Sequence, residues 1–345
     1  MEKTTDLAPK KKGWRWGVNR WIVLGLIVLG VFLMTNIFGV GLNIQPIRPA
    51  VQLPAENLTE HPLFTLPVLG DFYLTNTLVA LFIVDLLVIG LAAWFNSSVK
   101  KSIQNGDLTP KGLPSALEAL LEYLYNMTES TAGKWAWTIF PWFATITIMV
   151  LLANWMELIP GIDSIGWIKA TESGAGATLQ QLTPWLSALV KPTVTSGGYE
   201  VTPFIRVVST DLNFTVALAL IAVIAVQVIG IRAQGMKYFT KFWNVKTFFS
   251  RPIFGVIDWG VGLLELVSEF SKILSFAFRL FGNIFAGSVL LFVMGSLLGM
   301  ITVLPSMFYM LEFFVGAIQA VVFGLLTMTF MAQATQGHGE HEEAH

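Results

Sequence analysis

The chain has 345 residues, of which 54% are hydrophobic and 12% are charged. Soluble domains carry nearer 25% charged residues, so this composition predicts a protein with several membrane-spanning helices. Cysteine is absent, which excludes disulfide frameworks, cysteine zinc sites and thiol catalysis, and no long basic tract predicts binding to nucleic acid.

Six apolar stretches are long enough to cross a membrane, which takes about 20 residues. In chain order they are Trp21–Leu42, Leu78–Phe95, Ile139–Leu158, Asn213–Ile231, Ile253–Leu298 and Met307–Met331. The fifth is too long for one perpendicular crossing, and Gly299 and Pro305 mark the gap before the sixth. The sequence therefore predicts an all-α polytopic membrane protein of about six hydrophobic helices, the last two long.

The Lys and Arg residues that flank these stretches predict an orientation, because cytoplasmic loops carry an excess of them. Residues 1–20 hold six Lys and Arg against two acids, and residues 232–251 hold five and no acid. Residues 43–72 hold one basic residue and three acids. We therefore expect the N-terminus, 96–138 and 232–251 inside the cell, and 43–72 and 159–212 outside.

The first hydrophobic stretch has two interpretations. A basic segment before Trp21–Leu42 is typical of a signal peptide, but the stretch is longer than usual and no small-x-small cleavage site follows it. We favour a retained anchor and leave cleavage open. The expected organisation is a basic cytoplasmic segment at 1–20, the anchor at 21–42, an external segment at 43–73, the membrane domain at 74–335 and a polar tail at 336–345.

Two polar segments between and after the spans have simple interpretations. Pro114–Leu124 has apolar residues at helical spacing, with Glu118 and Glu122 one turn apart, and is predicted to be an amphipathic surface helix. The tail His338–His345 holds three of the four histidines. A metal site there is an alternative, but the composition favours a flexible charged tail. The external segment Gly161–Thr210 shows no pattern that indicates chemistry.

Arg279 is the most informative residue, because it is the only charged residue between Ile273 and Leu298. An arginine at the centre of a membrane helix costs roughly 2.5–3.5 kcal/mol, so it usually faces a partner or an aqueous cavity. Asn283 lies four residues later, on the same face of the helix.

Further polar residues lie on the same helix as Arg279, and others form a polar face on the last helix. Glu265 lies fourteen residues before Arg279, within about 40° of the same face, and Glu269 lies between them, as does Lys272. Glu312 and Gln319 are seven residues apart and share a face of the last helix. The sequence thus predicts two polar stripes on neighbouring helices.

An alternative is that these polar side chains have a structural role and hydrogen-bond to one another inside the membrane. It applies well to the amides Asn283 and Gln319, since amides commonly bridge membrane helices. For Asp85, isolated within an apolar run, burial against a partner is the better interpretation. Arg279 and Glu312 are functional candidates, because ionisable groups inside a membrane are expensive.

The residue types indicate ion translocation. Carboxylates load and release protons where water reaches them, so Glu265, Glu269 and Glu312 are candidate proton-relay groups. Arginine cannot take part in this way, because its pKa lies above about 12, so Arg279 would act as a fixed positive charge. The mobile acid would then come from a partner. The spans hold no phosphate-binding loop, catalytic triad or metal-ligand cluster, so we expect no catalysis by this chain and no cofactor.

A set of ordered motifs resembles one family. The run from Arg279 to Asn283, followed by Ala286 and Gly287, resembles a motif of subunit a of the rotary F-type ATP synthase. The resemblance extends from about Leu66 to the last helix. It includes Thr75–Leu78, Asn154–Gly161, Thr210–Asn213, Ala217–Leu220, Glu265 and Gln319.

The resemblance implies a stator subunit whose two long, tilted helices curve against a rotor ring of c subunits. It also implies two offset aqueous half-channels, b-type peripheral stalk partners, contact with membrane lipid, and phosphate chemistry in other subunits. By the same resemblance, Arg279 is the essential arginine, Asn283 its neighbour, Gln319 the glutamine that faces it, and Glu265 the acid on the long helix.

The chain departs from the family pattern at two positions. Many members carry a glutamate where this chain has Ser288, and some carry a histidine where it has Glu312. Together the departures indicate that an acid has moved from one helix to the other across the same cavity. Ser288 would then supply a hydroxyl to a water chain.

Two rival functions make different predictions. A secondary transporter with a charged intramembrane site would show internal repeats, and the halves of this chain show none. A structural scaffold would leave the cost of Arg279 uncompensated. The basic, anchor-bearing N-terminus favours a bacterial inner membrane over an organelle. The choice between proton and sodium stays open, because it would depend largely on the ring.

Overall fold

The computed structural model describes most of the membrane domain and little of the termini. The described residues are 21, 25, 29, 55–59, 61–67, 70–106, 112–159, 162–170, 176–183, 186–194, 197–242, 252–297 and 303–336. Of the predicted anchor only Trp21, Gly25 and Leu29 are described, and they are helical. The rest of the anchor, the basic segment 1–20 and the tail His338–His345 lie outside the described residues.

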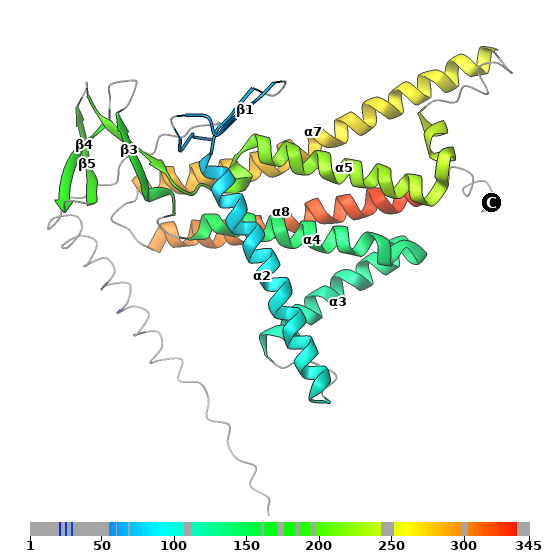
Figure 1. Cartoon of the computed structure of the whole chain (residues 1–345), viewed down its shortest axis with the longest axis horizontal. Helices are drawn as coiled ribbons and strands as arrows, with labels where there is room; N and C mark the ends of the chain where they lie inside the picture. Colours follow the sequence, from blue (N-terminus) through cyan, green and yellow to red (C-terminus); the bar gives the residue numbers. More distant parts are fainter. Residues whose placement is uncertain are drawn as a thin grey trace, which may run out of the picture. The chain divides into compact units, whose positions relative to one another are not determined.

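Five helical spans in the described part of the chain are long and apolar enough to cross a membrane, which confirms five of the six predicted spans (Figure 1). The helices are α2 (Asn76–Gln104), α3 (Leu113–Ala132), α4 (Ala136–Trp155), α5 (Leu212–Gln234), α7 (Pro252–Leu297) and α8 (Val303–Thr335). The predicted amphipathic helix forms as α3 and continues through a turn, η2 (Gly133–Trp135), into α4. Pro305, expected in the gap, lies in the first turn of α8, where its missing N–H removes no helical hydrogen bond.

The chain divides into two compact units. One unit comprises Met1–Arg48, Thr171–Tyr199 and Val293–Phe308. Its main described feature is an antiparallel hairpin of β4 (Gly176–Thr183) and β5 (Leu186–Val194). These strands were not predicted from the sequence.

The second unit contains nearly all of the helical bundle. Its short elements lie between the helices: β1 (Phe64–Leu66), β2 (Gly70–Phe72), η3 (Met156–Leu158), η4 (Ile162–Ser164), β3 (Gly166–Ala170), most of β6 (Tyr199–Pro203), η5 (Val208–Thr210) and η6 (Gly235–Lys241). The strands are short, so the fold of this unit is carried by its helices.

The first residues of α2 and α5 are bonded to each other. The Thr75 side chain caps α2 by accepting from the N–H of Leu78, and Asp211 caps α5 by accepting from the N–H of Asn213. Thr77 Oγ1 also donates to Asp211 Oδ2 at 2.8 Å. Two of the motifs seen in the sequence therefore fix the beginnings of two helices.

The core of the bundle lies between α4, α5, α7 and α8. Its buried members include Ile146, Val150, Leu218, Ala219, Ala222, Phe276, Ala277, Leu280, Ile284, Ala320 and Phe323. The rings of Phe276 and Phe323 lie 5.1 Å apart between α7 and α8. Burial of these apolar faces against one another leaves the remaining faces of the helices exposed.

Helices α7 and α8 run antiparallel in one register. Phe276 contacts Phe323, and eleven residues farther along α7 the backbone of Gly287 lies against the carboxyl group of Glu312, eleven residues earlier on α8. The same register places Gln319 level with Leu280, the residue after Arg279. The two polar stripes therefore lie on neighbouring helices, as predicted.

Candidate functional site

Arg279 lies on the exposed face of α7. Leu280 and Ile284 point into the core, whereas Arg279 and Asn283 are both exposed. Arg279 Nη2 has a long hydrogen bond of 3.4 Å to Ser275 Oγ. Among the described residues no carboxylate pairs with Arg279, so its charge faces outward from the bundle.

Gln319 is half-buried on α8 at the level of Arg279. Within the ranges that the structure describes, no hydrogen bond joins Gln319 to Arg279 or to Asn283. The structure brings the three residues to one level but does not connect them.

A cluster of polar residues joins α5, η6 and α7, and we call it the Lys241 cluster. Its members are Gln227, Tyr238, Lys241, Glu265, Glu269 and Lys272. After α5 the chain turns at Gly235, whose φ of +63° lies in the left-handed region that favours glycine. The turn brings the Tyr238 ring against Gly230, where a side chain would collide with it.

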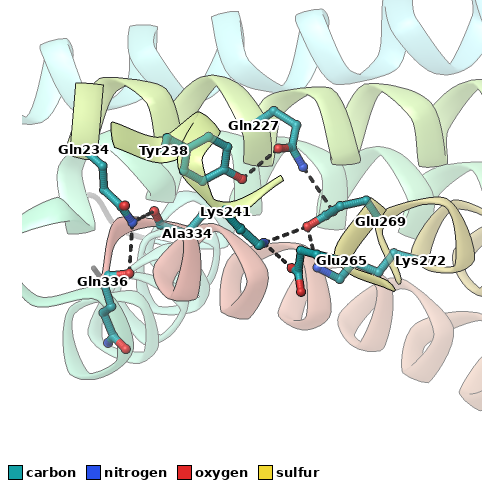
Figure 2. Close-up of polar contacts among 9 residues, drawn as sticks. All are labelled: Gln227, Gln234, Tyr238, Lys241, Glu265, Glu269, Lys272, Ala334 and Gln336. Carbon is teal, nitrogen blue, oxygen red and sulfur yellow. Dashed lines mark hydrogen bonds and ion pairs between the residues drawn. The ribbon is translucent and has the colours of Figure 1, made fainter. Parts of the chain in front are cut away.

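Of the two acids in the Lys241 cluster, Glu269 has the larger number of polar partners among the described residues (Figure 2). Its Oε1 lies 3.0 Å from Lys241 Nζ and 2.9 Å from Lys272 Nζ, and its Oε2 accepts from Gln227 Nε2 at 3.0 Å. Lys241 Nζ also forms an ion pair with Glu265. The cluster thus holds two carboxylates and two ammonium groups, whose formal charges cancel.

A cavity of about 180 Å³ lies beside this cluster. It is lined by Lys241, Glu265, Glu269 and Lys272, together with residues from the end of α8. The sequence predicted that Glu265, Glu269 and Lys272 lie on one polar stripe, but it indicated no role for Lys241 beyond its positive charge. No local pattern could show that Lys241, more than twenty residues earlier, folds back onto Glu265.

The second cluster lies farther along α7 and consists of Glu157, Ser288 and Glu312, which we call the Glu157 cluster. Ser288 Oγ donates to Glu157 Oε1 at 2.5 Å, and the carboxyl group of Glu312 lies against the adjacent Gly287. Glu157 is 9% exposed and Glu312 is 5% exposed. Among the described residues, Glu312 Oε2 has no hydrogen-bond partner. The structure therefore brings Ser288 and Glu312 together, as expected, and adds Glu157.

Glu157 lies within the motif Asn154–Gly161, but no role was predicted for it from the sequence. A carboxylate at the end of an apolar span was the available signal. Its position is fixed by Asn154, whose Oδ1 accepts from Ser209 Oγ at 2.6 Å and whose Nδ2 donates to the carbonyl oxygen of Gly316 at 3.0 Å. These bonds hold the end of α4 against α8, and so hold Glu157 near Glu312.

Asp163 lies in η4, just beyond the Glu157 cluster and within electrostatic range of Glu157. Burial raises the pKa of Asp163 to about 6, and the positive charge of Arg206 opposes that rise. Asp163 is therefore a carboxyl group that exchanges protons close to neutral pH.

The two clusters lie on opposite sides of Arg279. At 1.5 Å per residue, Glu265 is about 21 Å from Arg279 along α7, and Ser288 is about 14 Å beyond Arg279. In the part of the chain that the structure describes, no group of three or more His, Cys, Asp or Glu side chains could hold a metal ion. The arrangement suits the movement of protons toward and away from a fixed positive charge.

The chain is similar to known proteins over most of its length. A family model described as ATP synthase A chain matches residues 77–332. The protein named ATP synthase subunit a from Syntrophobacter fumaroxidans is 27% identical over 271 residues, which is 77% of this chain and 87% of that protein. The chloroplastic ATP synthase subunit a of Stigeoclonium helveticum is 30% identical over 243 residues, covering 68% and 78% of the two chains. ATP synthase subunit a of Mycobacterium ulcerans is 27% identical over 272 residues, covering 77% and 89%.

Proposed function

Because this chain belongs to the family of ATP synthase a subunits, multi-pass membrane components of the ATP synthase complex, we propose that it is the proton-channel stator of that complex. The observation that carries the proposal is the exposed Arg279, which lies along α7 between the Lys241 cluster and the Glu157 cluster. In this role the chain is not catalytic, and the phosphate chemistry takes place in other subunits.

Arg279 couples proton flow to rotation through its permanent charge. A ring of c subunits that passes the exposed face of α7 would bring its carboxylates one by one to Arg279. The guanidinium holds each of them ionised, because a nearby opposite charge favours the charged form of an acid. A carboxylate that leaves Arg279 must take a proton before it enters lipid, where a bare charge is costly. Arg279 also bars a direct proton path between the two clusters, since it cannot itself release a proton.

The Glu157 cluster forms the half-channel that opens outside. Glu312 has a buried oxygen with no partner among the described residues, Ser288 has a hydroxyl that can both donate and accept, and Asp163 marks the outer end. A water chain through these groups would deliver protons from outside toward Asn283 and the ring.

The Lys241 cluster forms the inner half-channel. Glu265 is its more exposed acid, with 30% of the side chain exposed, and it borders the cavity. Glu269 is already paired with two lysines and with Gln227. Glu265 is therefore the acid through which protons leave on the cytoplasmic side.

The proposal also assigns the chain a membrane, an orientation and partner subunits. The N-terminus and residues 232–251 lie in the cytoplasm of a bacterial cell with the chain in the inner membrane, 21–42 is a retained anchor, and 74–335 is the domain that binds the c ring. The b-type stalk subunits are further partners. A single cysteine placed at Lys237 should react with an impermeant reagent from the cytoplasmic side, and reaction from outside would reverse this orientation.

The decisive test is ATP synthesis by energised vesicles that contain the Arg279→Ala complex, with subunit content checked. Synthesis should fall to background. Arg279→Lys should rescue it poorly, because lysine lacks the planar, always charged guanidinium. Arg232→Ala, which removes an exposed arginine at the end of α5, is the matched control and should leave synthesis near normal. Near-normal, ionophore-sensitive synthesis by assembled Arg279→Ala complex would contradict the proposal.

A further inference from the structure

Asp85 lies near the middle of the membrane on α2, and the proposed function gives it no role. The apolar span that contains it is Leu78–Phe95, so at 1.5 Å per residue Asp85 is about 10 Å from one end of this span and about 15 Å from the other. An acid at that depth is costly and is usually paired. We expected Asp85 to be buried against a partner, but the helices of this chain cover it only in part.

Helix α2 is the least covered of the five spans in the described part of the chain. In its apolar part 11% of the residues are buried inside the protein, against 28–50% in the other four spans. Val84 is fully buried, whereas Phe82, Leu86 and Ile89 are more than half exposed. Asp85 lies between these two sides, because successive residues of a helix are about 100° apart. It therefore borders the face of α2 that the bundle leaves open.

A cavity of about 440 Å³ adjoins this border. It lies between α2, α4 and α5 and is lined mostly by apolar side chains, among them Leu81 of α2, Trp142 and Met149 of α4 and Phe214 of α5. Leu81 is four residues before Asp85, so both lie on the same side of α2. An apolar hollow and a carboxyl group are thus one helical turn apart at the surface of the bundle.

The volume of the cavity indicates what can enter it. Along α4 the lining extends from Pro141 to Met149, about 12 Å at 1.5 Å per residue. A helix with its side chains is about 10–12 Å wide, so a piece of that length has a volume of at least about 900 Å³, more than the cavity holds. Side chains from one face of a neighbouring helix do fit, in the way that helices pack by interlocking their side chains.

The sequence has no further Lys or Arg in its apolar spans that could pair with Asp85. The six spans contain only Lys272 and Arg279, both on α7, where Lys272 belongs to the Lys241 cluster and Arg279 lies on the exposed face. Residues 21–47, which include the predicted anchor, contain neither Lys nor Arg. The hydrocarbon core is about 30 Å thick, so lipid headgroups are about 15 Å from its middle. A cation for Asp85 therefore comes from another protein.

We propose that the open side of α2, together with the cavity between α2, α4 and α5, is a docking surface for a membrane-spanning helix of another subunit of the ATP synthase complex. That helix inserts apolar side chains into the cavity and carries a lysine or arginine level with Asp85. The ion pair offsets the cost of both charges, because neither is left bare in lipid. The inference does not depend on the role of Arg279 and adds an interaction surface to the proposed function.

The first experiment places a photoreactive group beside Asp85 in the assembled complex, which is practical because the chain has no cysteine of its own. Ile89→Cys is exposed and lies one turn after Asp85. Leu87→Cys is the matched control, because Leu87 is also exposed but lies about 200° from Asp85 around the helix. Each variant is labelled with a benzophenone maleimide in membranes and irradiated.

Ile89→Cys should form an adduct between this chain and a second subunit, and the cross-linked peptide should belong to an apolar span that contains a lysine or arginine. Leu87→Cys should not form this adduct. An adduct of Ile89→Cys with residues 21–42 of this same chain, or with lipid alone, would overturn the inference.

The second experiment measures the ratio of the cross-linked subunit to this chain in complex purified through a tag on this chain. Asp85→Lys sets a cation against the partner's cation, so the ratio should fall at least about tenfold. Asp85→Glu keeps the charge and should keep the ratio. Leu87→Lys is the matched control, because it places the same charge at nearly the same depth on the other side of α2, and its ratio should stay near that of the wild type.

Exchange of the two charges gives the sharpest outcome. Replacing the partner's lysine or arginine by aspartate should restore the ratio in Asp85→Lys. An unchanged ratio in Asp85→Lys would overturn the inference, and so would equal losses in Asp85→Lys and Leu87→Lys, because the general cost of inserting a charged helix would then explain both. The proposed function fails separately, if assembled Arg279→Ala complex with its full set of subunits still synthesises ATP.

Discussion

The contact between Gly287 and Glu312 permits a direct test of how α7 meets α8. A methyl group at Gly287 would occupy the space that the Glu312 carboxyl group fills. In Gly287→Ala, Glu312 must therefore rotate away or the helices must separate. The matched control is Gly260→Ala on the same helix, because a methyl group there meets no atom within 4 Å.

The size of the effect follows from two opposed terms. Replacing glycine by alanine inside a helix stabilises it by about 1 kcal/mol at both positions. Overpacking at Gly287 costs about 1–3 kcal/mol, and this cost is absent at Gly260. The free energy of unfolding of the two variants should therefore differ by about 1–3 kcal/mol, with Gly287→Ala the less stable.

The assay is unfolding by SDS in mixed micelles, followed by the fluorescence of the 12 tryptophans. The double variant Gly287→Ala/Glu312→Ala removes the collision and should regain most of the lost stability, so the two substitutions should not be additive. Equal unfolding free energies for Gly287→Ala and Gly260→Ala would show that the Glu312 carboxyl group does not lie on Gly287. The register of α7 against α8 would then be wrong.

Three further predictions use the same unfolding assay. Burial raises the pKa of Asp163 to about 6, so the wild-type chain should lose stability as the pH rises from about 4 to about 6, and Asp163→Asn should make that slope shallower. Asn154→Ala breaks the bond from Ser209 and one to a backbone carbonyl, and should cost about 1–3 kcal/mol, whereas an effect near zero would show that these bonds do not hold α4 to α8. Thr77→Val removes the bond to buried Asp211 and should cost about 1 kcal/mol, while Thr77→Ser should keep it; equal losses would exclude that bond.

The sequence predicted the helices well because their signal is local. Long apolar runs identified five spans in the described chain, and the end of α7 differs from its predicted position by one residue. The four-residue spacing of Arg279 and Asn283 correctly indicated a shared face. The resemblance of the motifs was sufficient to identify the family, which the match over residues 77–332 confirmed.

The polar clusters could not be predicted in full, because their members come from distant segments. Ser288 and Glu157 are 131 residues apart, and Gln227 and Glu269 are 42 apart. Periodicity shows which residues share a helix face, but not which face of another helix lies opposite. The hairpin β4–β5 was missed for a related reason: in a segment rich in small residues, strand pairing leaves little periodic signal. The roles assigned to Arg279 and the acids remain predictions for the experiments above.

The shared register of α7 and α8 has a consequence for anyone who builds chimaeras of this chain. One residue inserted between Phe276 and Gly287 would turn the following part of α7 by about 100°. Gly287 would then no longer face Glu312, and Ser288 would lose Glu157, although the local sequence around each residue would be intact. A transplanted α7 should therefore carry its own α8 with it, and a graft of either helix alone should assemble only where the donor preserves the spacing between these two contacts.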